Sequence, residues 1–270
     1  MYSVLDVAGL NPVTRKIIDN AASAIAGMTR VPPTSVVSAA RGATVAITAF
    51  GVTSAGAAHA RRRLEELGFE VLVFHATGSG GESLEQLVRS GFLAGVLDLT
   101  TTELADDMMG GVMSAGPSRL TAAAQLGVPQ VVSVGALDMV NLGPLADIPE
   151  AYKKRTLIQH NDFMTLMRTS VSESAEPGRR LAEKVSAATA PVAVFIPEHG
   201  VSSVAVEGAP FFDRAADQAL FGAIRSHLSP HVRLVQRAVD INDEGFAIEA
   251  ADLLAEFISQ DRKQDRKNHV

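Results

Sequence analysis

A glycine-rich turn that begins with a histidine is the first segment whose residue types suit ligand chemistry. It runs from His75 to Leu87 with the sequence HATGSGGESLEQL. Glycines permit a sharp turn that exposes backbone N–H groups, and a following helix adds the positive end of its dipole. We expect a site for a phosphate or a carboxylate here, formed by His75, Thr77, Gly78, Ser79, Gly80 and Gly81. The spacing matches neither GxGxxG nor GxxxxGK(S/T), so an ordinary turn with Ser83 as helix N-cap is the alternative.

A second segment places hydroxyl groups and carboxylates close together along the chain. Its sequence, LDLTTTELADDMMGG, starts at Leu97. Because Mg²⁺ is usually held by one or two carboxylates plus substrate oxygens, a metal at Glu103 or Asp106 is one interpretation. We expect ligand contacts from Thr100, Thr101, Thr102 and Glu103. The alternatives are that a threonine caps a helix and that the acids pair with arginines.

Polar groups also occur in the next two segments. Asp138 and Asn141 lie in SVGALDMVNLGP, an otherwise apolar stretch. Arg168 lies in IQHNDFMTLMRTS, and its planar guanidinium can bind a phosphate or a carboxylate through two hydrogen bonds. We expect all three to contribute to ligand binding, although an exposed arginine near a helix is a common alternative for Arg168.

Two histidines are candidates for acid–base catalysis. His160 follows a predicted strand in IQHND, and His199 lies beside Glu198 in IPEHGVSS. Positioned imidazoles and carboxylates are the usual general acids and bases. Adjacent residues face apart in regular structure, so a pair formed by Glu198 and His199 requires a turn.

The elements that must position these residues alternate between short apolar runs and amphipathic helices. Strands are predicted at residues 44–50, 71–75, 95–99, 130–134, 156–160, 192–196 and 232–237. Helices are predicted at residues 55–67, 83–90, 118–126, 174–188, 215–229 and 243–259. Continuous apolar runs indicate strands buried on both faces, as in parallel sheets. We expect an α/β fold with an open, doubly wound, mostly parallel, Rossmann-like sheet rather than a closed barrel, and ligands at its carboxyl edge.

The sequence divides into three parts. Residues 1–41 are predicted to form a helix from Asn11 to Met28 and a proline-rich linker, and residues 42–260 the Rossmann-like domain. Residues 261–270 are a charged tail, either a solvated helix end or a remnant unrelated to the fold. The apolar face of the first helix needs cover, so we expect a homo-oligomer such as a dimer.

Composition excludes several classes of function. The net charge of −6, the 5% aromatic content and the lack of Trp argue against nucleic acid as a partner. The absence of Cys excludes disulfides, zinc–thiolate sites, iron–sulfur clusters and cysteine nucleophiles. No apolar run approaches the ~20 residues of a transmembrane helix, and the first residues do not form a signal peptide. We therefore expect a cytoplasmic protein with no membrane partner.

Six segments carry a resemblance that extends over most of the chain. They are MYSVLDVAGLN, HATGSGGESLEQL, GVLDLTTTELADDMMGGVMSAGPSRL, GVPQVVSVGALDMVN, HNDFMTLMRTS and PFFDRAADQALF. Together they resemble the bacterial family that shares its domain with the tomato mosaic virus resistance protein. The resemblance implies an ATP-binding domain with two Rossmann-like halves, of which this chain matches the second half and the connecting segment. It also implies roles for the glycine-rich pattern at 77–81 and the threonine-rich pattern at 100–103.

The leading expectation is binding of ATP, or of another phosphorylated or anionic small molecule, at the carboxyl edge of the sheet. Mg²⁺ could accompany the phosphate groups. Hydrolase- or transferase-type chemistry with His160 or His199 as base would follow if the protein is an enzyme. The alternative is a non-catalytic interaction module that assembles, in a ligand-dependent way, as a dimer or with a separately encoded first half.

Overall fold

The computed structural model describes residues 11–30 and 44–268, and the side chains of the last helix up to residue 261. These residues belong to two units, Met1–Ala40 and Arg41–Val270. The first unit contains helix α1 (Pro12–Arg30), which confirms the predicted helix. Its N-cap is Asn11, whose Oδ1 accepts hydrogen bonds from the backbone N–H groups of Val13 and Thr14 at 2.9 Å. The predicted linker at 31–41 lies outside the described residues.

The second unit is built on a six-stranded parallel sheet with the order β2-β1-β3-β4-β8-β9. The strands are β1 (Thr44–Ala49), β2 (Glu70–His75), β3 (Gly95–Thr100), β4 (Gln130–Gly135), β8 (Val192–Pro197) and β9 (Arg233–Arg237). Val45 pairs with Val71 on one side and with Gly95 on the other. Because the chain extends the sheet from β1 in both directions, the sheet is doubly wound, and the predicted Rossmann-like α/β fold is confirmed.

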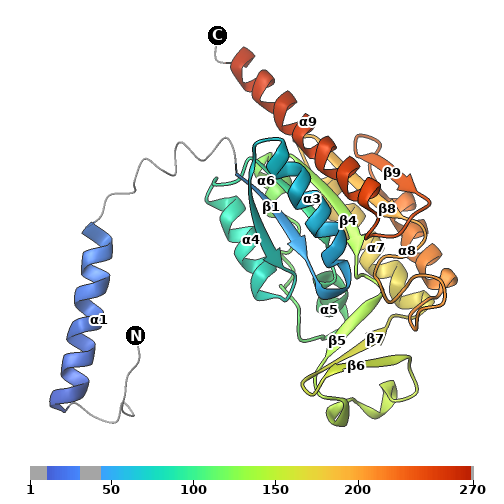
Figure 1. Ribbon diagram of the computed structural model, residues 1–270, viewed down its shortest axis with the longest axis horizontal. Helices are drawn as coiled ribbons and strands as arrows, with labels where there is room; N and C mark the ends of the chain where they lie inside the picture. Colours follow the sequence, from blue (N-terminus) through green and yellow to red (C-terminus); the bar gives the residue numbers. More distant parts are fainter. Residues whose placement is uncertain (1–10, 31–43, 269–270) are drawn as a thin grey trace. The chain divides into compact units, whose positions relative to one another are not determined.

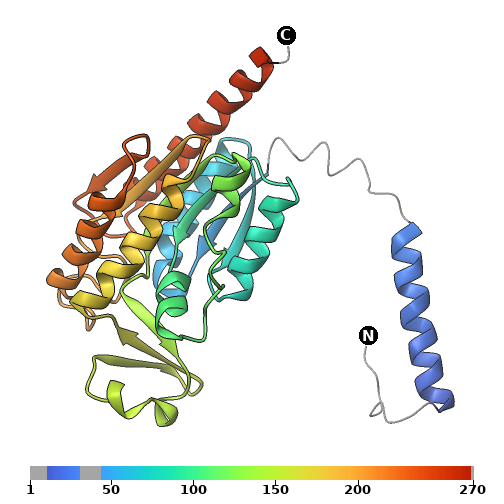
Figure 2. The same cartoon turned by 180° about the vertical axis from the view of Figure 1, so that it is seen from behind.

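Helices cover both faces of this sheet, as Figures 1 and 2 show from opposite sides. Helices α3 (Ser54–Glu66) and α9 (Glu244–Asn268) pack on one face. The other face is covered by α4 (Ser79–Arg89), α6 (Ala122–Leu126), α7 (Val171–Ser186) and α8 (Arg214–His227). Successive residues of a strand point to opposite faces of the sheet. Val45 and Ile47 pack with α3 and α9, and Ala46 packs with α4. The backbone of α9 remains helical through most of the predicted charged tail.

One predicted strand belongs to a different sheet. The segment predicted at 156–160 is β6 (Leu157–Asn161), which pairs antiparallel with β7 (Met164–Arg168), and β7 pairs with β5 (Met139–Leu142). Placing it in the parallel sheet was wrong, because Gln159 and His160 are exposed and do not belong to a fully buried strand. Figure 1 shows this small sheet projecting beyond one end of the parallel sheet.

Several shorter elements complete the domain. They are α5 (Glu103–Met109) and the 3₁₀ turns η1 (Gly51–Thr53), η2 (Leu145–Asp147) and η3 (Glu150–Tyr152). Helix α4 starts at Ser79 with Gly78 at its N-cap position, so the alternative in which Ser83 is the N-cap was wrong. Among the described residues, no helix is both long and apolar enough to cross a bilayer.

Candidate functional site

The glycine-rich turn after β2 already holds an anion, the carboxylate of Glu103. The backbone N–H groups of Gly78 and Gly81 donate to Glu103 Oε1 at 2.9 and 3.1 Å. Gly78 has a φ of +77°, a conformation that favours glycine, and a Cβ at Gly81 would lie 2.4 Å from the same oxygen. The predicted cradle therefore forms, but the partner of these two amides comes from the chain itself.

A fully buried arginine completes this arrangement. Arg119 forms ion pairs with Glu103 and with Asp98, whose Oδ2 accepts from Nη1 at 2.6 Å. Thr48 Oγ1 donates to Asp98 Oδ1 at 2.8 Å, and Glu85 lies 3.6 Å from Arg119. Burial raises the pKa of Glu103, and the neighbouring guanidinium acts against this rise. We call Asp98, Glu103, Glu85 and Arg119 the Arg119 cluster; it corresponds to the expected alternative that the acids pair with arginines.

The three predicted threonines are fully buried and hold strand ends together. The hydroxyls of Thr100 and Thr53 are 2.7 Å apart, and Thr101 Oγ1 donates to the carbonyl oxygen of Ser133 at 2.9 Å. Thr102 occupies the N-cap position of α5, although its side chain makes no cap hydrogen bond. These contacts join the carboxyl end of β3 to η1, which follows β1, and to β4.

The proposed metal ligands point to separate protein partners. Asp106 accepts hydrogen bonds from the backbone N and from Nδ2 of Asn141 at 2.8 and 2.7 Å, and Glu103 belongs to the Arg119 cluster. Burial raises the pKa of Asp106 to about 7, and the bonds from Asn141 oppose the rise. In the part of the chain that the structure describes, no three His, Asp or Glu side chains are grouped so as to hold a metal ion. Both candidate ligands thus have protein partners, and Mg²⁺ at either of them stays a prediction.

Arg168 and Asp138 tie the small sheet to the main domain. Arg168 is only 6% exposed, which overturns the alternative of an exposed arginine. Its guanidinium donates to Asp217 Oδ1 at 2.5 Å and to the backbone oxygens of Phe211 and Asp138. Asp138 accepts from Ser202 Oγ at 2.8 Å, while its Oδ1 is buried and has no hydrogen-bond partner among the described residues. Burial raises the pKa of Asp138.

A cavity of about 420 Å³ lies where β1 ends, the strand from which the sheet grows in both directions. In doubly wound sheets this point is where ligands bind. We call it the switch-point cavity; it is lined by Phe50, Gly51, Val52, His75, Met113, His160, Asn161, Met164 and Leu166. The ring of His75 stacks on Phe50 at 5.4 Å, and His160 comes from the hairpin of β6 and β7. Two histidines predicted from separate segments thus line one cavity.

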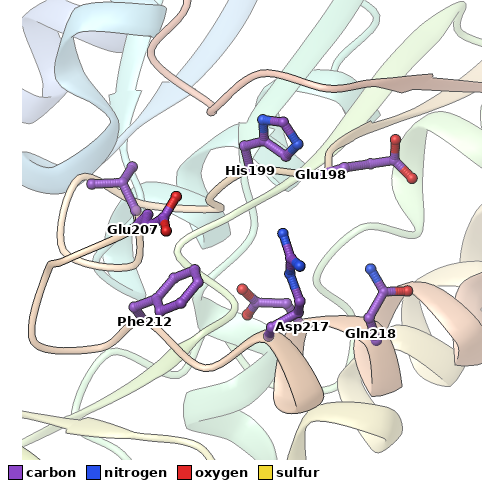
Figure 3. Close-up of a pocket in the computed structure, with 8 residues that line it drawn as sticks. Glu198, His199, Glu207, Phe212, Asp217 and Gln218 are labelled. Carbon is purple, nitrogen blue, oxygen red and sulfur yellow. The ribbon is translucent and has the colours of Figure 1, made fainter.

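A second cavity of about 320 Å³ follows β8 and is shown in Figure 3. We call it the β8 cavity; it is lined by Glu198, His199, Val206, Glu207, Phe212, Arg214, Asp217 and Gln218. Glu198 Oε1 accepts from Gln236 Nε2 at 2.9 Å, and its carboxylate points away from the ring of His199 in Figure 3. The predicted acid–base pair is therefore not formed, although both residues line the same cavity.

Sequence reasoning missed several residues of these sites. Arg119 stands in no recognisable motif, and nothing in the sequence indicated its role. Phe50, Gly51 and Val52 had a usable signal, because a glycine directly follows the first strand in AFGVTSAG. Arg214 and Asp217 lie in the first turn of a helix, where charged residues are common for other reasons.

The chain thus folds as a doubly wound α/β protein. Two cavities large enough for small molecules lie at the carboxyl edge of its sheet. The chain belongs to the family UPF0261: residues 42–258 match the C-terminal domain of this uncharacterised protein family, and residues 1–34 match its N-terminal domain.

Three relatives show how far the similarity extends. The chain is 46% identical to a UPF0261 protein of Clostridium tetani, over 96% of the chain and 64% of that protein. It is 43% identical to one from Mesorhizobium japonicum, over 92% and 62%. It is 41% identical to the ToMV resistance protein Tm-1(GCR237) of Solanum lycopersicum, over 96% of the chain and 35% of that protein. The chain thus spans less than two thirds of the length of each.

Among solved structures, one of the Lac repressor bound to ONPG is similar over 96% of this chain and 88% of its own. The TM-score is 0.30 at 12% sequence identity, which is too low to support an argument.

Proposed function

We propose that the chain binds a small anionic molecule, ATP or another phosphorylated compound, in the switch-point cavity. The observation that carries the proposal is the chemistry of the lining: two imidazoles and one amide face the cavity, and none of its lining residues is acidic. A volume of about 420 Å³ lies within the range of small-molecule sites.

The polar and apolar parts of the cavity suit different parts of such a ligand. His75 and His160 can donate N–H bonds to phosphate oxygens, and the turn from Gly51 leads into α3, whose amino-terminal end favours negative charge. Met113, Met164 and Leu166 supply apolar contacts for a base or an acyl group. A cytoplasmic location, where nucleotides are abundant, is part of this proposal.

Mg²⁺ enters the proposal only together with the phosphate groups. The described residues offer no cluster of acids and histidines that would hold the ion without a ligand. We therefore expect Mg²⁺ to change the affinity for a triphosphate more than the affinity for inorganic phosphate.

The test is ligand-induced stabilisation of the full chain by ATP, ADP and inorganic phosphate, each with and without Mg²⁺. A ligand that binds the folded state at one hundred times its Kd adds about 2.7 kcal/mol to the free energy of unfolding and raises the Tm. We expect His75→Ala and His160→Ala each to weaken ATP binding about tenfold or more. His231→Ala is the matched control, because His231 is exposed and lines neither cavity.

Two results would contradict the proposal. One is the absence of any Tm shift with ATP, ADP or phosphate. The other is a shift that survives unchanged in the double variant H75A/H160A, since the anion would then bind elsewhere.

Hydrolase- or transferase-type turnover is an extension of this function. His160 is on a short hairpin and faces the cavity, so it can take a proton from a water or hydroxyl that attacks a bound phosphoryl or carbonyl group. His199 and Glu198 line the β8 cavity and could do so only for a ligand bound there. Loss of phosphate release in His160→Ala at ATP concentrations that saturate the variant would support this extension; wild-type protein that binds ATP without turnover would contradict it.

A second candidate is a ligand-dependent interaction module. Helix α1 exposes four large apolar side chains, Val13, Ile18, Ile25 and Met28, with exposed fractions of 46–75%. Such a face suits a second copy of the chain or a separately encoded first half. Light scattering of the full chain with and without ATP tests it: a dimer that Ile25→Asp dissociates supports the module, and a monomer under both conditions contradicts a homodimer.

A further inference from the structure

The β8 cavity contains charges of both signs that do not neutralise each other. Arg214 lines this cavity together with the carboxylates of Glu198, Glu207 and Asp217. Among the residues that the structure describes, Arg214 forms no ion pair with any of the three, and neither Glu207 nor Glu198 is paired with a cation. Asp217 pairs with Arg168, so a ligand can supply a charged partner that Arg214, Glu198 and Glu207 lack.

Asp217 offers the most specific acceptor in this cavity. It is 5% exposed, and its Oδ1 accepts a hydrogen bond from Arg168 at 2.5 Å. Its other oxygen, Oδ2, receives no hydrogen bond from the described residues, although Asp217 lines the cavity. A carboxylate that lines a cavity and has one oxygen without a donor favours a ligand that brings an N–H or O–H group.

Hydrogen bonds hold the two walls of the cavity in place. On one wall, the backbone N–H groups of Glu198 and His199 donate to the carbonyl oxygens of Arg237 and Val239 at 2.8 and 3.0 Å. On the other wall, Asp213 caps α8 by accepting from two backbone N–H groups at 3.0 Å, which fixes the helix turn that carries Arg214 and Asp217. Figure 3 shows Asp217, Gln218 and Phe212 across the cavity from His199.

We propose that the β8 cavity binds a small zwitterion of the α-amino-acid class. The ligand's carboxylate pairs with Arg214, and its ammonium group is held by Glu207 and Asp217. The exposed ring of Phe212 contacts the ligand's side chain.

The distribution of charge favours this class over singly charged ligands. A simple anion would gain Arg214 but would lie near three carboxylates, and a simple cation would leave Arg214 without a partner beside its own positive charge. A zwitterion matches both signs at once. The volume of about 320 Å³ accommodates one amino acid with some water. The proposal is independent of the anion site, because the two cavities share no lining residue.

The test uses isothermal titration of the full chain with L-alanine, L-glutamine, L-lysine and L-phenylalanine. For the amino acid that binds most tightly, the N-acetyl form lacks the ammonium group and the methyl ester lacks the carboxylate. We expect each blocked form to bind at least tenfold more weakly than the free amino acid, since each loses one charge-assisted interaction.

Variants assign each end of the ligand to a side chain. Arg214→Gln should weaken the free amino acid to the level of its methyl ester while leaving the affinity for the ester unchanged. Glu207→Gln should act in the same way toward the ammonium group and the N-acetyl form. The controls are Arg233→Gln and Glu256→Gln, two exposed residues outside the cavity, which should leave binding unchanged.

Three outcomes would overturn the proposal. Methyl esters that bind as tightly as free amino acids would indicate a cation site. N-acetyl forms that bind as tightly would indicate an anion site. The absence of binding by all four amino acids would show that the cavity does not serve this class of ligand.

Discussion

Arg119 and Arg214 each lie near three carboxylates, but they differ in what they contact. Arg119 is completely buried and lies within ion-pair distance of Asp98, Glu103 and Glu85. Arg214 is exposed and lines a cavity with its three carboxylates, with no ion pair to any of them. Burial makes an unpaired charge costly, so the charges of the Arg119 cluster must pair with one another. Charges in a solvated cavity can remain unpaired, because water solvates them. Residue types alone do not separate a structural cluster from a binding site; the pairing of the charges does.

The largest expected effect comes from removing the buried arginine. Arg119→Met leaves Asp98 and Glu103 in the interior without their cation, and breaking a buried pair from one side typically costs about 3–5 kcal/mol. We expect a loss of this size in the free energy of unfolding, measured by urea denaturation. The matched variant Arg214→Met should change it by less than about 0.5 kcal/mol. Equal effects of the two variants would remove the distinction between the two regions.

A smaller effect is expected from pH, because Asp106 is buried beside a neutral partner, Asn141, instead of an arginine. Its pKa rises from 3.8 to about 7 in the folded state. The folded state therefore binds the proton more tightly than the unfolded chain does. The contribution of Asp106 to the free energy of unfolding is fully present below about pH 4 and is lost as the pH rises through 7. Between pH 5 and pH 8 this corresponds to a loss on the order of 2–3 kcal/mol.

Asp106→Asn isolates this contribution from other titrating groups. Asp217, whose pKa burial raises to about 6, acts in the same direction in both proteins and cancels in the difference. We expect the wild-type protein to lose more stability than the variant between pH 5 and pH 8, measured by urea denaturation at both values. Parallel curves would mean that Asp106 is ionised in the folded state throughout this range.

The smallest of the three effects tests how tightly the glycine-rich turn encloses Glu103. Gly81→Ala places a Cβ 2.4 Å from Glu103 Oε1, and such overpacking costs typically about 1–3 kcal/mol. Gly222→Ala is the matched control, since it lies in α8 with nothing within 4 Å of the added Cβ, and alanine is the better helix former. We expect a lower Tm for the first variant and an equal or higher Tm for the second. A turn that opens for an external anion would instead tolerate Gly81→Ala.

Much of the fold was predictable from the sequence. The six parallel strands were all predicted, because burial on both faces produces continuous apolar runs such as those of β1 and β8. The small sheet was not predicted, because β5 and β7 bury polar side chains. Asn141 and Arg168 look like loop or surface residues until the structure shows that Asn141 donates to Asp106 and Arg168 to Asp217.

The candidate sites were predictable only in part. The sequence indicated His75, His160, Glu198 and His199, all of which line cavities. It also indicated the glycine-rich turn, whose amides pair with Glu103, a residue more than twenty positions away in the chain. Such pairings depend on tertiary contacts that local spacing does not encode. A glycine-rich turn whose amides bind a side chain of the same protein therefore has the same sequence pattern as one whose amides bind an external anion.

The small sheet is inserted in the crossover between β4 and α7, which then leads to β8. The neighbouring strands β4 and β8 pair in parallel, from Gln130 and Val192 onward, without any contribution from this insertion. The switch-point cavity consequently has two different walls. One follows the strands of the parallel sheet and has the geometry of any doubly wound sheet, and the other belongs to the inserted small sheet. Exchanging or resizing the β6–β7 hairpin would reshape this cavity, the proposed anion site, while the register of the parallel sheet stays unchanged. New specificities could thus arise in this architecture through a segment of a few residues.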